Sequence, residues 1–73
     1  MNLMKFTILA EKDTHTQLSN EVEILINVDQ IATIKPIKII IEGEVIDGYW
    51  IRTTFGKKYR ATKIPDQLKK LLN

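Results

Sequence analysis

The chain has 73 residues and a mass of 8.5 kDa, which is enough for one small domain spanning residues 1–73. Folding at this size hides only about 60% of the surface that the unfolded chain exposes, so contacts with a partner are a reasonable source of added stability. There is no cysteine, which excludes disulfides and thiolate metal sites. No aliphatic run is longer than three residues, so we expect a soluble, cytoplasmic protein without a membrane segment.

The net charge of +2 is unevenly distributed along the chain. Residues 1–47 hold four basic and eight acidic side chains, a net charge of −4, whereas residues 48–73 hold seven basic side chains and one acidic, a net charge of +6. Such asymmetry can steer an anionic ligand to the basic part, or bring copies of the same protein together through opposite charges. Both interpretations stay open.

Apolar residues alternate with period two near the N-terminus, which is typical of half-buried strands. Met4, Phe6 and Ile8 fall on one face, with Lys5 and Thr7 on the other, which predicts a first strand. Residues 11–20 are polar and without period, which predicts a loop.

The alternation resumes at residues 22–28, which predicts a second strand. Asn27 and Asp29 flank a predicted bend, because both side-chain types bond to nearby backbone amides. Ile31 and Ile34 lie three apart, which favours a short twisted piece over a regular strand. Pro36 cannot donate to a sheet ladder, so we expect an edge or a break there.

Residues 37–42 are apolar on both faces, which predicts a third strand covered from two sides by a curled sheet or by another subunit. Residues 42–48 (EGEVIDG) hold two glycines and three carboxylates, and we predict a connection there. Near the C-terminus, Ile64, Leu68, Leu71 and Leu72 have helical spacing, which predicts a short amphipathic helix at about residues 65–72 that docks on the sheet.

Residues 48–63 (GYWIRTTFGKKYRATK) are a predicted hairpin whose register can be judged by how it separates its faces. A two-residue loop at Gly56 and Lys57 places apolar core side chains and charged side chains on the same face of the hairpin. A three-residue loop at residues 54–56, with Gly56 in the left-handed conformation, separates them, so we predict the second register. One face then carries Tyr49, Ile51, Tyr59 and Ala61, and the other carries Trp50, Arg52, Lys58, Arg60 and Thr62.

The candidate contact surface is the second of these faces, with Trp50 across from Arg60 and with Arg52 and Lys58 beside them. One interpretation is a platform for single-stranded nucleic acid or a nucleotide, in which a base stacks on the indole and the cations hold phosphates. The other interpretation is structural. It is a cation–π pair on a solvated face, or a tryptophan covered by the terminal helix or by a second subunit.

Residues for catalysis or metal binding are sparse. The only histidine and the only serine lie in the polar segment, and no glycine-rich phosphate loop or zinc-ligand spacing is present. Two acidic clusters are weak candidates for cation ligands: Glu11, Asp13 and His15, and separately Glu42, Glu44 and Asp47. We predict no catalytic residue, no metal site and no cofactor, and hence no enzyme.

Two segments resemble known families. Residues 26–34 (INVDQIATI), followed by residues 55–59 (FGKKY) and a terminal helix, are similar to the small FlbD-type flagellar proteins. The strand-Asn-bend element is also similar to one in LytTR-type DNA-binding domains. The resemblance implies a strand-rich fold and carries no function across.

The sequence therefore predicts a mainly β protein with about five strands in a bent antiparallel sheet or small barrel, closed by the C-terminal helix. We expect a non-catalytic, self-associating regulatory or inhibitory protein of the compact, bacterial or phage-like kind. Its expected partner is another protein or a second copy of itself. The alternative is a nucleic-acid or nucleotide binder using Trp50, Arg52, Lys58 and Arg60.

Overall fold

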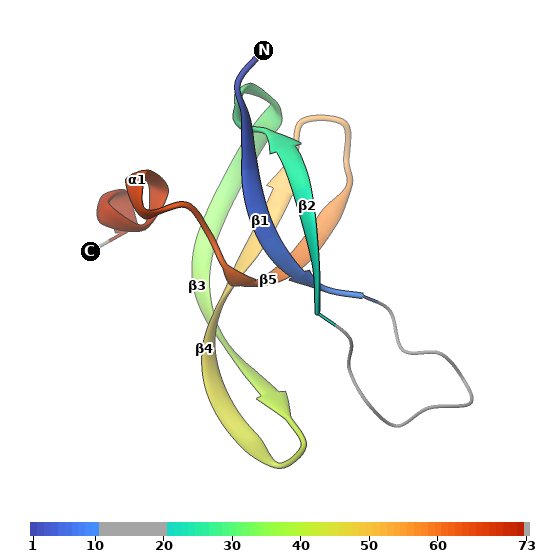
Figure 1. Cartoon of the computed structure of the whole chain (residues 1–73), viewed down its shortest axis with the longest axis vertical. Helices are drawn as coiled ribbons and strands as arrows, with labels where there is room; N and C mark the ends of the chain where they lie inside the picture. The colour runs from blue at the N-terminus through green and yellow to red at the C-terminus, as the bar shows by residue number, and fades with distance from the viewer. Residues whose placement is uncertain (11–20, 73) are drawn as a thin grey trace.

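The computed structural model describes residues 1–10 and 21–72 of the chain (Figure 1). Its elements are β1 (Leu3–Leu9), β2 (Glu21–Asn27), the 3-10 turn η1 (Val28–Gln30), β3 (Ile31–Ile41), β4 (Glu44–Thr53), β5 (Lys58–Lys63), helix α1 (Asp66–Lys69) and the 3-10 turn η2 (Lys70–Leu72). The strands form one antiparallel sheet in the order β2-β1-β5-β4-β3. Its two edges are β2 and β3, so the sheet is open. The predicted five-stranded antiparallel fold is confirmed.

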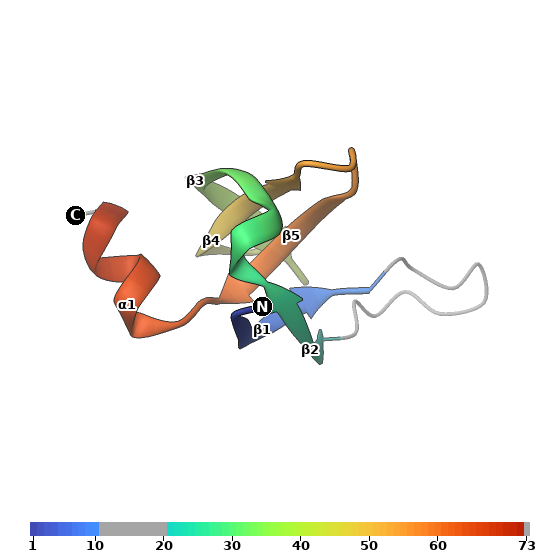
Figure 2. The same cartoon turned by 90° about the horizontal axis from the view of Figure 1, so that it is seen from above.

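The strands form a strongly bent sheet (Figure 2), and the core lies on one of its faces. Phe6 and Ile51 are completely buried there, as the alternation in the first strand and the hairpin predicts. The buried cluster comprises Phe6, Ile8, Ile26, Ile51, Ala61 and Ile64. These side chains come from β1, β2, β4, β5 and the segment before the helix, so the core depends on strands that are distant in the sequence.

The bend after β2 is held by one side chain. The Asn27 Oδ1 atom accepts hydrogen bonds from the backbone N–H groups of Asp29 and of Asn2, both at 3.1 Å. The first of these caps η1, and the second ties the N-terminus to the bend. The predicted change of direction at Asn27 and Asp29 is confirmed.

The prediction of a short twisted piece at Ile31 and Ile34 is wrong, since β3 runs unbroken for 11 residues from Ile31 to Ile41. A register shift between Ile31 and Thr33 accounts for the three-residue spacing, because a bulge lets side chains three apart lie on one face. Pro36 lies inside this strand, opposite Tyr49. The sheet tolerates it because β3 is an edge strand, in agreement with the expectation from the sequence.

The predicted connection at residues 42–48 is also wrong. The turn consists only of Glu42 and Gly43, with φ of 50° and 80°, and β4 begins at Glu44. Positive φ at both central residues is the geometry of the tight turn that matches the twist of paired strands. Because β5 pairs with β4 only from Tyr49 onward, the preceding residues of β4 pair only with β3. We call residues 37–48 the ribbon, a two-stranded projection seen at the bottom of Figure 1.

The hairpin of β4 and β5 has the predicted register. Tyr49 pairs with Ala61, Trp50 with Arg60 and Ile51 with Tyr59. Gly56 has φ of 90°, and the Thr53 N–H donates to the Lys57 carbonyl at 2.8 Å across the three-residue loop. The predicted left-handed glycine is confirmed.

The C-terminal segment is helical from Asp66 to Leu72, with a last turn of 3-10 type, which agrees with the predicted helix at about residues 65–72. Leu68 and Leu72 pack against the core cluster. Figures 1 and 2 place this helix and the turn between β4 and β5 on opposite sides of the molecule. No helix in residues 1–10 and 21–72 has the length and apolar character needed to cross a membrane.

Candidate functional site

The four candidate contact residues lie on the face of β4 and β5 opposite the core. Trp50 pairs with Arg60, and Arg52 pairs with Lys58. Arg52, Lys58 and Arg60 are exposed, whereas Trp50 is half-buried. Since neighbouring side chains of a strand point to opposite faces, these residues are separated from the buried Ile51.

Trp50, Lys58 and Arg60 line an open hollow of about 510 Å³. We call it the Trp50 hollow. Its lining residues are Ile8, Leu9, Ala10, Trp50, Lys57, Lys58, Tyr59 and Arg60. Arg52 is not among them, so the structure brings together three of the four predicted residues and leaves the fourth outside.

Sequence reasoning missed the wall that β1 contributes. Leu9 and Ala10 reach the hollow because β1 pairs with β5, with Ile8 opposite Ala61. No local period reveals a pairing between the first and last strands. Lys57 was also missed, although its place next to Gly56 in the turn was a usable signal.

The lining of the Trp50 hollow is cationic and apolar. Among the residues that the structure describes, it is lined by Lys57, Lys58 and Arg60 and by no carboxylate. Such a lining favours a ligand that combines negative charge with a flat or apolar group. It therefore has the chemistry expected of a site for an anionic partner.

The two structural explanations for Trp50 can be compared with the contacts of the described residues. The cation–π contact found there joins the Lys57 Nζ atom to the Tyr59 ring, at 5.7 Å from its centroid, and does not involve Trp50 and Arg60. The terminal helix packs on the core face, away from Trp50. Neither the predicted cation–π pair nor cover by the helix accounts for this tryptophan.

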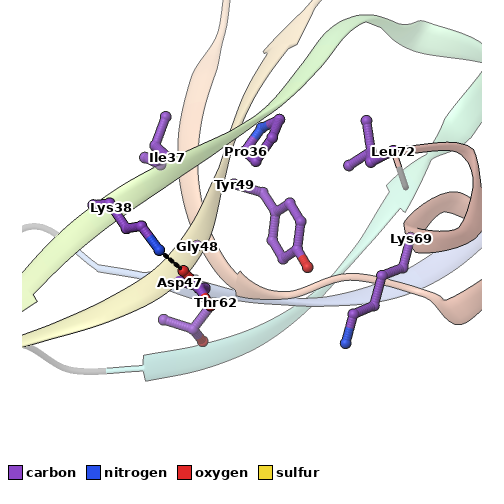
Figure 3. Close-up of a pocket in the computed structure, with 9 residues that line it drawn as sticks. All are labelled: Pro36, Ile37, Lys38, Asp47, Gly48, Tyr49, Thr62, Lys69 and Leu72. Carbon is purple, nitrogen blue, oxygen red and sulfur yellow. Dashed lines mark hydrogen bonds and ion pairs between the residues drawn. The ribbon is translucent and has the colours of Figure 1, made fainter.

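A second hollow, of about 450 Å³, lies between the ribbon and the terminal helix (Figure 3). The Tyr49 ring lies in its middle, with Pro36 on one side and Lys69 on the other. Thr62 also lines this hollow, and its Oγ1 atom is buried without a hydrogen-bond partner in the described part of the chain.

Opposite charges are already paired beside this second hollow. The Lys38 ammonium donates a hydrogen bond to the Asp47 carboxylate, and this bond and the positive charge of Lys38 lower the pKa of Asp47. The two side chains are largely exposed, so their attraction contributes little to stability. Asp47 offsets one of the two lysines that line this hollow, Lys38 and Lys69, so the hollow is less suited to an anion than the Trp50 hollow with its three cations.

The two acidic clusters that the sequence offers as cation ligands differ in what the structure describes. Glu11, Asp13 and His15 lie outside the described residues. Within residues 1–10 and 21–72, no three histidine, aspartate or glutamate side chains gather closely enough to hold a metal ion. Glu42, Glu44 and Asp47 therefore do not form a metal-binding group.

Comparisons with models of protein families, with curated proteins and with solved structures found no match. The resemblance of residues 26–34 and 55–59 to the flagellar and LytTR-type proteins thus stays a prediction.

Proposed function

We propose that this chain is a small non-catalytic binding protein that self-associates and acts as a regulatory or inhibitory module through protein contacts. The observation that carries the proposal is the ribbon. Ile40 and Val45 pair directly across it, and their exposed fractions are 73% and 64%. Apolar side chains held side by side on a rigid strand pair are a typical anchor for a protein partner.

The edge position of the ribbon supports the same proposal. β3 is the last strand of the sheet, so one side of its backbone has no strand partner within the sheet. Such an edge can accept a strand from another chain unless charged residues or proline protect it. Lys35, Pro36 and Lys38 protect part of β3, whereas residues 39–41 are all isoleucine. The part of β3 that is unprotected against pairing with another chain is therefore its end at residues 39–41, next to the turn of the ribbon.

We expect the wild-type protein to elute with a mass above 8.5 kDa when size exclusion is combined with light scattering at high concentration. The double variant Ile40→Thr/Val45→Thr should run as a monomer, because it loses the exposed apolar pair while threonine keeps the strand preference. Leu71→Gln, which changes a side chain that is 79% exposed on η2, is the matched control and should keep the wild-type mass. A wild-type monomer at all concentrations would remove self-association from the proposal.

A second candidate function, binding of single-stranded nucleic acid or a nucleotide, is favoured by the Trp50 hollow. Lys57, Lys58 and Arg60 line this hollow together with the half-buried indole of Trp50. Bases stack on aromatic rings in a manner that tolerates any sequence, and lysine and arginine neutralise phosphates. The hollow offers both kinds of contact in one place.

For this second function, adding an oligonucleotide at low salt should quench the fluorescence of Trp50, the only tryptophan in the chain. Lys58→Ala/Arg60→Ala should reduce the slope of log affinity against log salt by about 1.4, because two phosphate contacts to a single strand are lost. Lys69→Ala/Lys70→Ala removes the same charge from the helical segment and should leave the slope unchanged. Absence of quenching at low salt would exclude binding of nucleic acid at the Trp50 hollow.

A further inference from the structure

We infer that the tip of the ribbon of one copy docks into the Trp50 hollow of a second copy. The inference rests on the proposed self-association and deepens it by naming the two contacting surfaces. It follows from the complementarity of the two surfaces, in charge and in apolar character.

The tip of the ribbon is acidic and apolar. Glu42 occupies the two-residue turn, Glu44 follows it, and both are exposed. Directly behind them lies the exposed pair of Ile40 and Val45. The tip therefore presents two carboxylates with an apolar base, on an end only two strands wide.

The Trp50 hollow has the opposite charge and the matching apolar surface. Lys57, Lys58 and Arg60 line it together with Trp50 and Leu9, and no carboxylate within residues 1–10 and 21–72 does. Docking of the tip would place its two carboxylates among the three cations and its aliphatic side chains against the indole. Opposite potentials steer encounter and fix register, while buried aromatic side chains anchor an interface.

The geometry of the contact determines the type of assembly. The donor surface is the ribbon and the acceptor surface is the Trp50 hollow, which are different parts of the chain, so the contact is heterologous unless both tips of a pair enter both hollows. In a pair joined by one such contact, one copy keeps a free hollow and the other keeps a free tip. Assembly should then continue past the dimer into rings or chains as concentration rises. The −4 charge of residues 1–47 and the +6 charge of residues 48–73 fit the same arrangement.

Exchange of charges between the two surfaces tests the contact. Glu42→Lys/Glu44→Lys makes both tip and hollow positive, and Lys58→Glu/Arg60→Glu makes both negative. Each variant alone should run at the 8.5-kDa monomer mass by light scattering, because its own surfaces repel. An equimolar mixture should assemble again, because each tip then meets a hollow of opposite charge. The changed side chains are exposed, and far-UV circular dichroism checks that each variant is folded.

Lys69→Glu/Lys70→Glu is the control, since it reverses two charges on the helical segment and should keep the wild-type assembly. If both charge variants assemble like the wild type, or if their mixture stays monomeric, the docking of tip into hollow is wrong while self-association by another surface stands. If the wild type is monomeric, self-association itself fails. If an oligonucleotide quenches Trp50 in the assembled protein without dissociating the assembly, the hollow is open to nucleic acid, which overturns the inference.

Discussion

Gly48→Ala is expected to lower the free energy of unfolding by about 2–3 kcal/mol, as overpacking a closely packed site does. A Cβ atom at this position would lie 2.9 Å from the Ala61 carbonyl oxygen and 2.9 Å from the Ile39 Cγ1 atom, and it would overlap the Ile39 Cδ1 atom. The carbonyl belongs to the backbone of the neighbouring strand, so it cannot move away without disturbing β5. For a domain of this size the midpoint of thermal unfolding should fall by roughly 10–20 °C, measured by circular dichroism.

Two further variants separate crowding from backbone effects. Ile39→Val removes the Cδ1 atom that the new methyl group would overlap, so it should cost less in the Gly48→Ala background than in the wild type. Gly43→Ala is the control, because Gly43 has φ of 80° and a methyl group there would meet nothing within 4 Å. The loss of unfolding free energy in Gly43→Ala comes from the backbone conformation alone. It should therefore be the same with and without Ile39→Val. Additive effects of Gly48→Ala and Ile39→Val would contradict the close approach.

Gly48 also explains why the sequence misled the prediction of the ribbon. Two glycines and three carboxylates in residues 42–48 are typical of a connection. In the structure only Gly43 serves the turn, while Gly48 lies within β4 and makes room for the buried Ile39. A glycine that permits close approach and a glycine that permits a turn look the same in a sequence.

The hairpin was predictable for a physical reason. If the pairing of β4 and β5 slipped by one residue, the side chains of one strand would move to the opposite face of the sheet. The requirement that Ile51 and Ala61 are both buried therefore specifies the register. Gly56 specifies the loop. In β3, by contrast, the bulge between Ile31 and Thr33 hides the period of two. Local alternation predicted regular pairing well and irregular pairing poorly.

The candidate site was predictable only in part. The hairpin itself places Trp50, Lys58 and Arg60 on one face, and that placement follows from its register. The wall formed by Leu9 depends on pairing between the first and last strands, which only the complete fold determines. The basic face was thus visible in the sequence, whereas the hollow was not.

Thr53→Val is expected to cost about 1–2 kcal/mol of unfolding free energy, because it replaces a buried hydroxyl that makes two hydrogen bonds by a methyl group of similar shape. Thr53 is only 2% exposed. Its Oγ1 atom accepts from the Lys57 N–H at 3.0 Å and donates to the Lys57 carbonyl at 3.1 Å. The carbonyl keeps its bond from the Thr53 N–H, so the loss falls mainly on the Lys57 amide. Lys57 is exposed, so water can partly replace the lost partner, which keeps the cost moderate.

This hydroxyl matters beyond stability because Lys57 lines the Trp50 hollow. Hydrogen exchange of the Lys57 amide should speed up in Thr53→Val more than exchange in the strands does. Thr53→Ser keeps the hydroxyl and loses only a buried methyl group, so it should leave the Lys57 amide protected relative to the strands. The other side of the turn is held independently, since the Thr54 N–H donates to the Gln30 carbonyl at 2.7 Å, and that amide should stay protected in both variants. Equal exchange of the Lys57 amide in the valine and serine variants would show that the Thr53 hydroxyl does not order this wall of the hollow.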